Sequence, residues 1–395
     1  RPARFQIDDN KVITIASETG VKPVKEKNIT FKGRVSPGGM IAINTKTGEI
    51  FSEKQIDEKL KNRAPYRDWL KESTVYVESS LDKYEGPGLK KINSEDFNIS
   101  SKLFLLFKEE RTSVIKPLAI DSQEGTGSMG DDTALAVMSK MHRQIYDYFR
   151  QQFAQVTNPP IDSLREASVM SLETCYGPEL NIFDETPEHA KRLVTTSPVL
   201  SYKKLQSIIA NSYFKCEEIK LEYKKQINLK SALETLQKKV IQSAKNGNTI
   251  IHLKESLPDK NLLPINALLA VGCVHQKLVK LGLRSKVNLV ITSSSARDTH
   301  QIACLIGFGA TAVYPSLAYQ TILDLTERNE LKGDAHENCA RYRKGINKGL
   351  LKIISKMGIS TISSYRGSQL FEIVGLNNEI VDLCFTNSVS RIQGK

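Results

Sequence analysis

Cysteine and histidine are scarce in this chain, and neither residue type is grouped. The six cysteines among the 395 residues are far apart, with no C-x-x-C pair, and the six histidines form no H-E-x-x-H motif. Structural zinc sites and iron–sulfur clusters need closely spaced ligands. The spacing therefore predicts no metal site within this chain. No G-x-G-x-x-G motif follows a predicted strand, so no cofactor site is predicted from the motifs either. Cysteines this sparse also predict reduced thiols and a cytoplasmic location.

Long apolar runs and an N-terminal leader are also missing. No window approaches the ~18 consecutive apolar residues that a membrane helix needs. The chain starts with Arg1 rather than Met and shows no charged-then-apolar leader, so we expect a piece of a longer polypeptide. With 40% hydrophobic and 25% charged residues, the composition is that of a globular protein and excludes a collagen-like, coiled-coil or disordered chain.

Acidic residues are outnumbered by basic ones, 44 to 56, which gives a net charge of +12. A basic chain raises the hypothesis of a nucleic-acid-binding module. However, lysine and arginine are spread over the whole length, and the densest group is RYRK at residues 341–344. The distribution favours a solvated basic surface, or an interface with an acidic partner, over nucleic-acid binding.

Residues 1–75 alternate short apolar runs with turn signals. Strands are predicted over residues 12–16 and 40–44, a hairpin turn at residues 47–49, and a helix over residues 52–70. Residues 76–125 are charged and irregular, with the breaker GPG at residues 86–88, and are interpreted as a linker with some helix, such as residues 101–110. The first part is therefore expected to be a small β-rich domain, and the second a connection.

Strands alternate with helices in the last two hundred residues. This alternation predicts right-handed βαβ units, so the fold class of residues 126–395 is α/β, with a mostly parallel sheet and flanking helices. The predicted strands are 249–253, 287–292, 312–314 and 359–362, and the predicted helices are 229–246, 264–281, 298–307, 344–357 and 366–375.

A glycine-rich loop at residues 125–133 precedes apolar residues spaced by three and four, which predict an amphipathic helix over residues 133–156. Asp131 or Asp132 is its expected N-cap, and Pro159 and Pro160 are expected to stop it. The loop lacks the Lys-Ser/Thr pair of a P-loop, and its two aspartates would repel a phosphate. We expect it to shape the backbone at a domain interface.

The segment SSSARDTH at residues 293–300 follows a predicted strand, where ligand sites of parallel α/β sheets lie. Arg297, Asp298 and His300 could bind a small anion or act in acid–base chemistry. The alternative is a helix start capped by Ser295 or Asp298. Arg366, in a similar position after residues 359–362, has the same two interpretations. No nucleophile elbow is present, so no catalytic residue is predicted.

Several strings resemble the large subunit of glutamate synthase. They are GSMGDDT at 127–133, YFRQQFAQVTNPPID at 148–162, ARDTH at 296–300, KMGIST at 356–361 and SYRGSQLFE at 364–372. Residues 1–5, 16–18 and 67–69 resemble the last part of that family's class II glutamine amidotransferase domain. The resemblance implies the end of an amidotransferase domain at 1–75, a linker at 76–125 and the central domain at 126–395.

The resemblance also implies a reaction, but the catalytic residues and cofactors that perform it are expected outside this chain. The family converts glutamine and 2-oxoglutarate, with two electrons, into two glutamates. FMN, an iron–sulfur cluster, and NADPH or ferredoxin as the electron source belong to the parent enzyme. The implied partners are the amidotransferase and FMN domains of the same polypeptide and an electron-donor subunit or ferredoxin.

By the same resemblance, the central domain contributes to the wall of an internal ammonia passage, whose entrance involves Met129 and Thr157. Candidate interface or anion-loop residues are Ser128, Gly130, Asp131, Asp132, Asn158, Arg297, Asp298, His300 and Arg366. Ala134 stands where the family commonly has proline. The alternatives are a stand-alone α/β enzyme that binds a small anion and the nucleic-acid-binding module.

Overall fold

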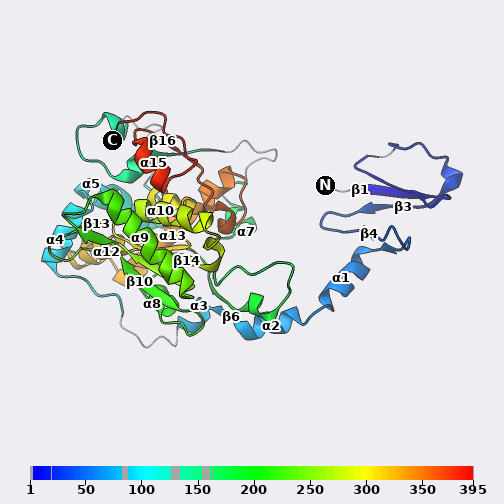
Figure 1. Cartoon of the computed structure of the whole chain (residues 1–395), viewed down its shortest axis with the longest axis horizontal. Helices are drawn as coiled ribbons and strands as arrows, with labels where there is room; N and C mark the ends of the chain where they lie inside the picture. Colours follow the sequence, from blue (N-terminus) through cyan, green and yellow to red (C-terminus); the bar gives the residue numbers. More distant parts are fainter. Residues whose placement is uncertain are drawn as a thin grey trace. The chain divides into compact units, whose positions relative to one another are not determined.

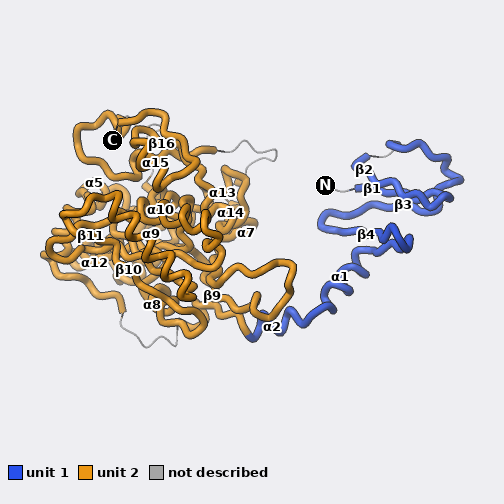
Figure 2. The backbone as a smooth tube through the Cα atoms, viewed as in Figure 1, with its two compact units in different colours: residues 1–72 blue, residues 73–395 orange. Residues whose placement is uncertain are grey.

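The computed structural model describes residues 3–18, 20–81, 88–125, 134–153, 161–162 and 164–394. The chain folds as two compact units, residues 1–72 and 73–395 (Figure 2). The first unit is rich in β-structure and the second contains the α/β fold, so the predicted fold class is confirmed.

The first unit contains an antiparallel sheet with strand order β2-β1-β3 and a hairpin of β4 and β5. The predicted strand at 12–16 is present as β2, whereas the one at 40–44 is reduced to β4. The predicted helix at 52–70 is divided, because Pro65 has no N–H to continue a helical ladder. The elements are β1 (Ala3–Asp8), β2 (Ile13–Ala16), β3 (Ile29–Val35), β4 (Ala42–Ile43), β5 (Ile50–Phe51), α1 (Glu53–Lys61) and α2 (Tyr66–Ser73).

The second unit is built around a parallel sheet with strand order β10-β12-β14-β15 (Figure 1). Its strands are β10 (Cys216–Lys220), β12 (Ile250–Lys254), β14 (Asn288–Ser293) and β15 (Ala312–Pro315). The last three match the predicted strands, and each is almost entirely buried, as expected of a parallel sheet covered on both faces. β10 was not predicted, because its charged residues Glu217 and Glu218 hide the strand pattern.

Helices cover both faces of this sheet. Ile219 of β10 faces the helix α9 (Leu229–Lys245), which packs beside α10 (Ala267–Lys280). On the opposite face, Glu218 and Tyr314 face α8 (Tyr202–Ile209) and α12 (Ser316–Glu327). The alternation follows from the two-residue period of a strand, which sends neighbouring side chains to opposite faces.

Further elements complete the second unit. Residues 76–125, expected as a linker with a helix near 101–110, contain one helix over residues 94–103 and a continuous helical stretch over residues 108–121. Ile115, Leu118 and Ala119 of this stretch are fully buried. The remaining elements are β6 (Thr74–Tyr76), α3 (Val77–Ser80), α4 (Ser94–Leu103), α5 (Lys108–Glu110), the π-helical turn η3 (Arg111–Ile115), α6 (Lys116–Asp121), α7 (Glu166–Val169), β8 (Thr174–Tyr176), η6 (Pro187–Ala190), β9 (Arg192–Thr195), β11 (Glu222–Lys224), β13 (Leu262–Pro264), η7 (Arg284–Lys286), α11 (Thr299–Gly307) and α13 (Ala335–Lys356).

The predicted long helix over residues 133–156 is wrong for the part that the structure describes. Residues 134–153 contain the short 3-10 turns η4 (Ala136–Met138) and η5 (Ile145–Tyr148) and the strand β7 (Phe149–Gln151). Met138 and Met141 are exposed, while Tyr146 and Phe149 are fully buried. The apolar residues therefore do not share one helical face, because Phe149 enters an aromatic cluster of the second unit and β7 pairs with β16 (Phe371–Ile373).

The predictions for residues 359–375 are also wrong. Instead of a strand followed by a helix, the chain forms the short helix α14 (Ile362–Tyr365), the strand β16 and then α15 (Asn378–Cys384). Thr361 makes only an isolated bridge to Ser171. Pairing of β16 with a segment more than two hundred residues away overrides the local preference for helix.

Candidate functional site

The loop that follows β14 encloses the fully buried carboxylate of Glu255, which itself follows β12. Its Oε2 accepts hydrogen bonds from the Ser293 hydroxyl at 2.7 Å and from the N–H groups of Ser294 and Ser295 at 2.9 and 2.8 Å. Its Oε1 accepts the N–H of Ala267, the first residue of α10, at 2.9 Å. These hydrogen bonds join the ends of two strands to the N-terminus of a helix through a single carboxylate.

Sequence reasoning missed Glu255. The signal that could have found it is an acidic residue directly after a buried strand, opposite a serine-rich loop that follows the neighbouring strand of the parallel sheet. The carboxyl ends of neighbouring parallel strands meet at one edge of the sheet, which brings such residues together.

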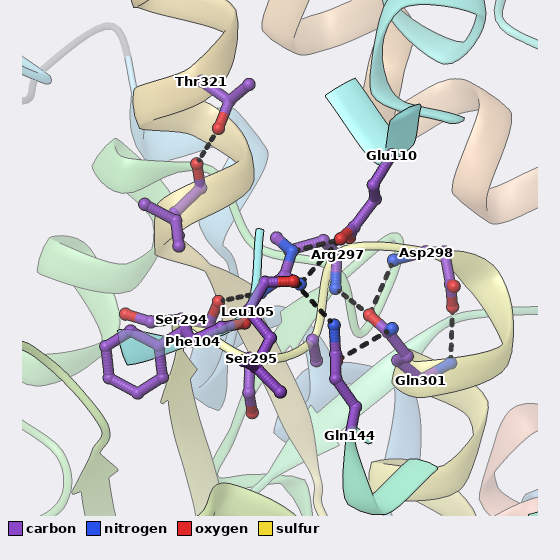
Figure 3. A network of polar contacts seen from close by, with 12 residues as sticks. Phe104, Leu105, Glu110, Gln144, Ser294, Ser295, Arg297, Asp298, Gln301 and Thr321 are labelled. Carbon is purple, nitrogen blue, oxygen red and sulfur yellow. Dashed lines mark hydrogen bonds and ion pairs between the residues drawn. The ribbon is translucent and has the colours of Figure 1, made fainter. Parts of the chain in front are cut away.

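Arg297 lies fully buried in the same loop, and all five of its N–H donors are engaged (Figure 3). Nε and Nη2 donate to the two carboxylate oxygens of Glu110, at 2.6 and 2.8 Å. Nη1 donates to the carbonyls of Phe104 and Ser294, at 3.1 and 2.8 Å, and Nη2 also reaches the carbonyl of Leu105 at 3.5 Å. The guanidinium therefore has no donor left for an anion from outside. It fixes the 104–110 segment to the edge of the sheet.

Asp298 is the N-cap of α11, as one of the two interpretations predicted. Its Oδ1 accepts the N–H of Gln301 at 2.7 Å, and the Gln301 side chain accepts the N–H of Asp298 at 3.3 Å (Figure 3). Burial raises the pKa of Asp298, and the neighbouring His300 opposes this shift. The His300 Nε2 lies 3.2 Å from the carbonyl oxygen of Tyr146, so this side chain too contacts the protein interior.

Tyr146 connects this loop to the segment 134–153. Its hydroxyl lies 3.1 Å from the Ser295 Oγ, and its side chain is fully buried. Burial raises the pKa of Tyr146 well above its usual value, and the negative charge of Glu255 adds to the shift. The phenol therefore stays protonated and acts as a hydrogen-bonding anchor.

A cavity of about 380 Å³ lies beside this loop. Its wall is largely apolar, and the polar groups of Glu255, Asn266 and Ser295 face it. The Asn266 Nδ2 lies 3.4 Å from the Ser295 Oγ, so these groups also contact one another. The cavity therefore has an apolar wall with a few polar groups, and contacts among these polar groups fix their positions.

A second polar group occupies the α8 and α12 side of the sheet. The Nδ1 of the buried His252 lies 3.2 Å from the Glu218 carboxylate, and its Nε2 lies 2.8 Å from the Thr292 hydroxyl. Lys254 donates to the same carboxylate at 3.1 Å. The contact with His252, strengthened by Lys254 and opposed by burial, lowers the pKa of Glu218 from its usual 4.5 to about 2.

We expect the substitution Glu218→Gln to weaken the fold at neutral pH and to have less effect in acid. The folded pKa of Glu218 lies below its unfolded value, so the carboxylate stabilises the fold above about pH 4.5 and loses this contribution as the pH falls toward 2. Urea unfolding of both proteins between pH 7 and pH 3 measures the difference. The same substitution at the exposed Glu330 is the control. A difference that stays constant with pH would contradict the expectation.

The remaining candidates lie elsewhere or outside the described residues. Arg366 follows α14 and lines a different pocket, with His275 and Arg284. Outside the described residues are Ser128, Met129, Gly130, Asp131, Asp132, Thr157 and Asn158. Among the residues that are described, no cluster of His, Cys, Asp and Glu is arranged to hold a metal ion. Within the same ranges, no helix has the length and apolar character that a bilayer crossing requires.

The second unit is thus an α/β domain whose predicted anion loop is built into its own core, and it follows a β-rich unit. The model of the glutamate synthase central domain matches residues 100–377, and the model of class II glutamine amidotransferases matches residues 1–69. The chain belongs to the glutamate synthase family, and the resemblance noted in the sequence is confirmed.

Curated relatives match along the whole chain. It is 36% identical over 415 residues to ferredoxin-dependent glutamate synthase 1 of Arabidopsis thaliana, covering 100% of this chain and 25% of that protein. It is 33% identical over 396 residues to the glutamate synthase [NADPH] large chain of Bacillus subtilis, covering 100% and 26%. The ferredoxin-dependent glutamate synthase of Cyanidium caldarium is 38% identical over 416 residues, with the same coverage of 100% and 26%. The chain therefore spans about a quarter of the length of these relatives.

Proposed function

We propose that this chain is part of a glutamate synthase large subunit and that its central domain connects the glutaminase domain to the FMN-binding domain. The observation that carries the proposal is a match over the full chain to proteins about four times as long. We propose the end of the amidotransferase domain near residue 75, close to the limit of the first unit at Glu72. Residues 76–125 then form a connection that packs onto the central domain at 126–395.

The central domain further contributes, in this proposal, to the wall of an ammonia passage. Ammonia must stay unprotonated to attack 2-oxoglutarate, and bulk water near pH 7 would protonate it, so a passage that excludes water is needed. The proposed entrance residues, Met129 and Thr157, lie outside the described residues. The segment between them, 134–153, supports the proposal because Tyr146 and β7 attach it firmly to the domain.

Bond-making steps are assigned, in this proposal, to the other domains of the parent. There an amidotransferase thiolate releases ammonia from glutamine, and reduced FMN delivers the two electrons to the imine formed from 2-oxoglutarate. The described part of this chain supports a scaffold role, because the donors of Arg297 and the acceptors of Glu255 are engaged with the protein itself. The electrons come from ferredoxin or NAD(P)H, the donors named for the relatives. We propose a cytoplasmic location.

We expect Thr157→Trp in the full parent polypeptide to uncouple its two half-reactions. An indole at the entrance would obstruct the passage, so ammonia would escape into solvent while glutamine hydrolysis continued. The ratio of glutamate formed from 2-oxoglutarate to glutamine consumed should fall at least about tenfold, which corresponds to ~1.4 kcal/mol. Parallel assays of glutamine loss, released ammonia and FMN-dependent glutamate synthesis measure this ratio.

The matched control is Thr235→Trp, at an exposed position of α9. It should leave the ratio unchanged. Circular dichroism first establishes that Thr157→Trp keeps the fold of the parent. A folded variant whose ratio is unchanged, including one in which both activities fall equally, would refute the proposed role of this residue.

A further inference from the structure

A pocket of about 340 Å³ lies at the amino-terminal end of β14, at the opposite end of the strand from the Glu255 loop. We call it the arginine pocket, since Arg284 and Arg366 both line it. Its other lining residues are Gly177, Glu179, His275, Ser285, Val287 and Asn288. The pocket therefore contains two guanidinium groups and one carboxylate, that of the exposed Glu179.

Arg284 is held rigidly in this pocket. Its Nη1 donates to the carbonyl of Val287 at 2.6 Å, its Nη2 to the carbonyl of Gly309 at 2.8 Å, and its Nε to the Nδ1 of His275 at 3.0 Å. These bonds use three of the five donors of a guanidinium and leave one on each terminal nitrogen. Burial, and then the charge of Arg366, lower the pKa of Arg284 to about 10, so it remains charged at neutral pH.

His275 is neutral and can donate a hydrogen bond from its Nε2. Its Nδ1 accepts the hydrogen bond from Arg284, so the ring proton lies on Nε2. Burial, followed by the charge of Arg284, lowers the pKa of His275 to about 4. A Cβ at Gly309 would lie 2.3 Å from the His275 Nδ1, and the φ of Gly309 is +119°, so only glycine lets the ring take this position.

Arg366 is the unusual member of the pocket. Its Nε is buried and has no hydrogen-bond partner among the described residues. Burial lowers the pKa of Arg366, and the negative charge of Glu179 is among the influences that oppose this shift. The Nη1 of Arg192 is likewise buried without a partner among the described residues. This nitrogen lies next to Gly177, which lines the pocket: a Cβ built on Gly177 would lie only 2.4 Å from the Arg192 Nη1. Leaving a buried N–H donor without an acceptor is costly, so these two nitrogens favour an acceptor that a ligand would bring.

We propose that the arginine pocket binds a small oxyanion, a carboxylate or phosphate group, between Arg366, the free donors of Arg284 and the Nε2 of His275. Two guanidinium groups offer flat pairs of donors that match the two oxygens of a carboxylate or phosphate. The proposal concerns residues of this chain alone and does not depend on the ammonia passage.

The test uses the full 395-residue chain, with inorganic phosphate and succinate as separate probes. Calorimetric titration and thermal unfolding are carried out at constant ionic strength, with sodium chloride as the balancing salt. We expect saturable binding and a rise in the unfolding temperature with at least one probe. Whichever probe binds more tightly identifies the phosphate or the carboxylate as the preferred group.

Arg366→Met should weaken this binding at least about tenfold and change the stability of the ligand-free protein little, because the buried Arg366 Nε has no hydrogen-bond partner to lose. Arg192→Met should weaken it by a smaller factor, and Arg67→Met, at an exposed position of α2, should leave it unchanged. Absence of saturable binding by both probes would overturn the proposal. Equal binding by wild type and Arg366→Met would overturn it as well.

Discussion

Arg297→Met is expected to lower the free energy of unfolding by about 3–5 kcal/mol, the usual cost of removing one partner of a buried ion pair. The Glu110 carboxylate would lose both donors of its bidentate pair, and its side chain is only 14% exposed. The carbonyls of Phe104 and Ser294 would lose a donor at the same time. Equilibrium unfolding in urea, followed by circular dichroism, measures the change.

Two further variants define this effect. Arg297→Lys keeps the charge but not the planar set of donors, so it should still lose a large part of the stability. Arg328→Met is the matched control, because that side chain is 54% exposed and its ion pair with Asp324 should contribute less than ~1 kcal/mol. If Arg297→Met lowered the free energy of unfolding no more than the control does, the contacts of Arg297 would not be what holds the 104–110 segment against the sheet.

Glu255→Gln is expected to lower the free energy of unfolding by about 3 kcal/mol or more, although the two side chains have nearly the same shape. An amide carries an NH₂ group, and both carboxylate positions here face donors. One position faces the N–H groups of Ser294 and Ser295, and the other faces the N–H of Ala267. Either orientation of the glutamine leaves buried donors opposed to one another.

The same urea experiment measures this variant, with the exposed Glu330→Gln as its control. Amide exchange adds a local readout, since protection should fall first at Ala267, Ser294 and Ser295. A loss of less than about 1 kcal/mol would mean that the carboxylate is not the anion that joins these strand ends to α10. Uniform loss of protection across the domain would point to global unfolding alone and would remove the local role.

The sequence predicted the parallel sheet well where buried strands are short apolar runs between clear helices. The strands at 249–253, 287–292 and 312–314 and the helices at 229–246, 264–281 and 298–307 are present within a few residues. Helix ends carry a local signal too: Gly247 and Gly282 follow α9 and α10, and both have a positive φ, which glycine adopts at little cost. Family membership was readable from the long strings shared with glutamate synthase.

Local patterns failed where a distant segment decided the structure. Residues 134–153 carry a helical spacing, yet β7 pairs with β16, and Phe149 packs against Phe308 and Phe385. The residues of each pair are more than one hundred and fifty positions apart, so the pattern of neighbouring residues does not reveal that they contact one another. The energy of burying an aromatic ring in the core exceeds a helix preference of a few tenths of a kcal/mol per residue.

Sequence alone thus determined the class of fold and the family, and it offered Asp298 as one of two possible caps at the start of α11, because each of these depends on neighbouring residues or on shared strings. Only the tertiary structure decided what Arg297, Glu255 and Arg366 do. Arg297 is paired with the Glu110 carboxylate, and Glu255 accepts hydrogen bonds from other elements. The Arg366 Nε has no hydrogen-bond partner among the described residues. The role of a charged side chain is set by what surrounds it in space, which the order of residues does not contain.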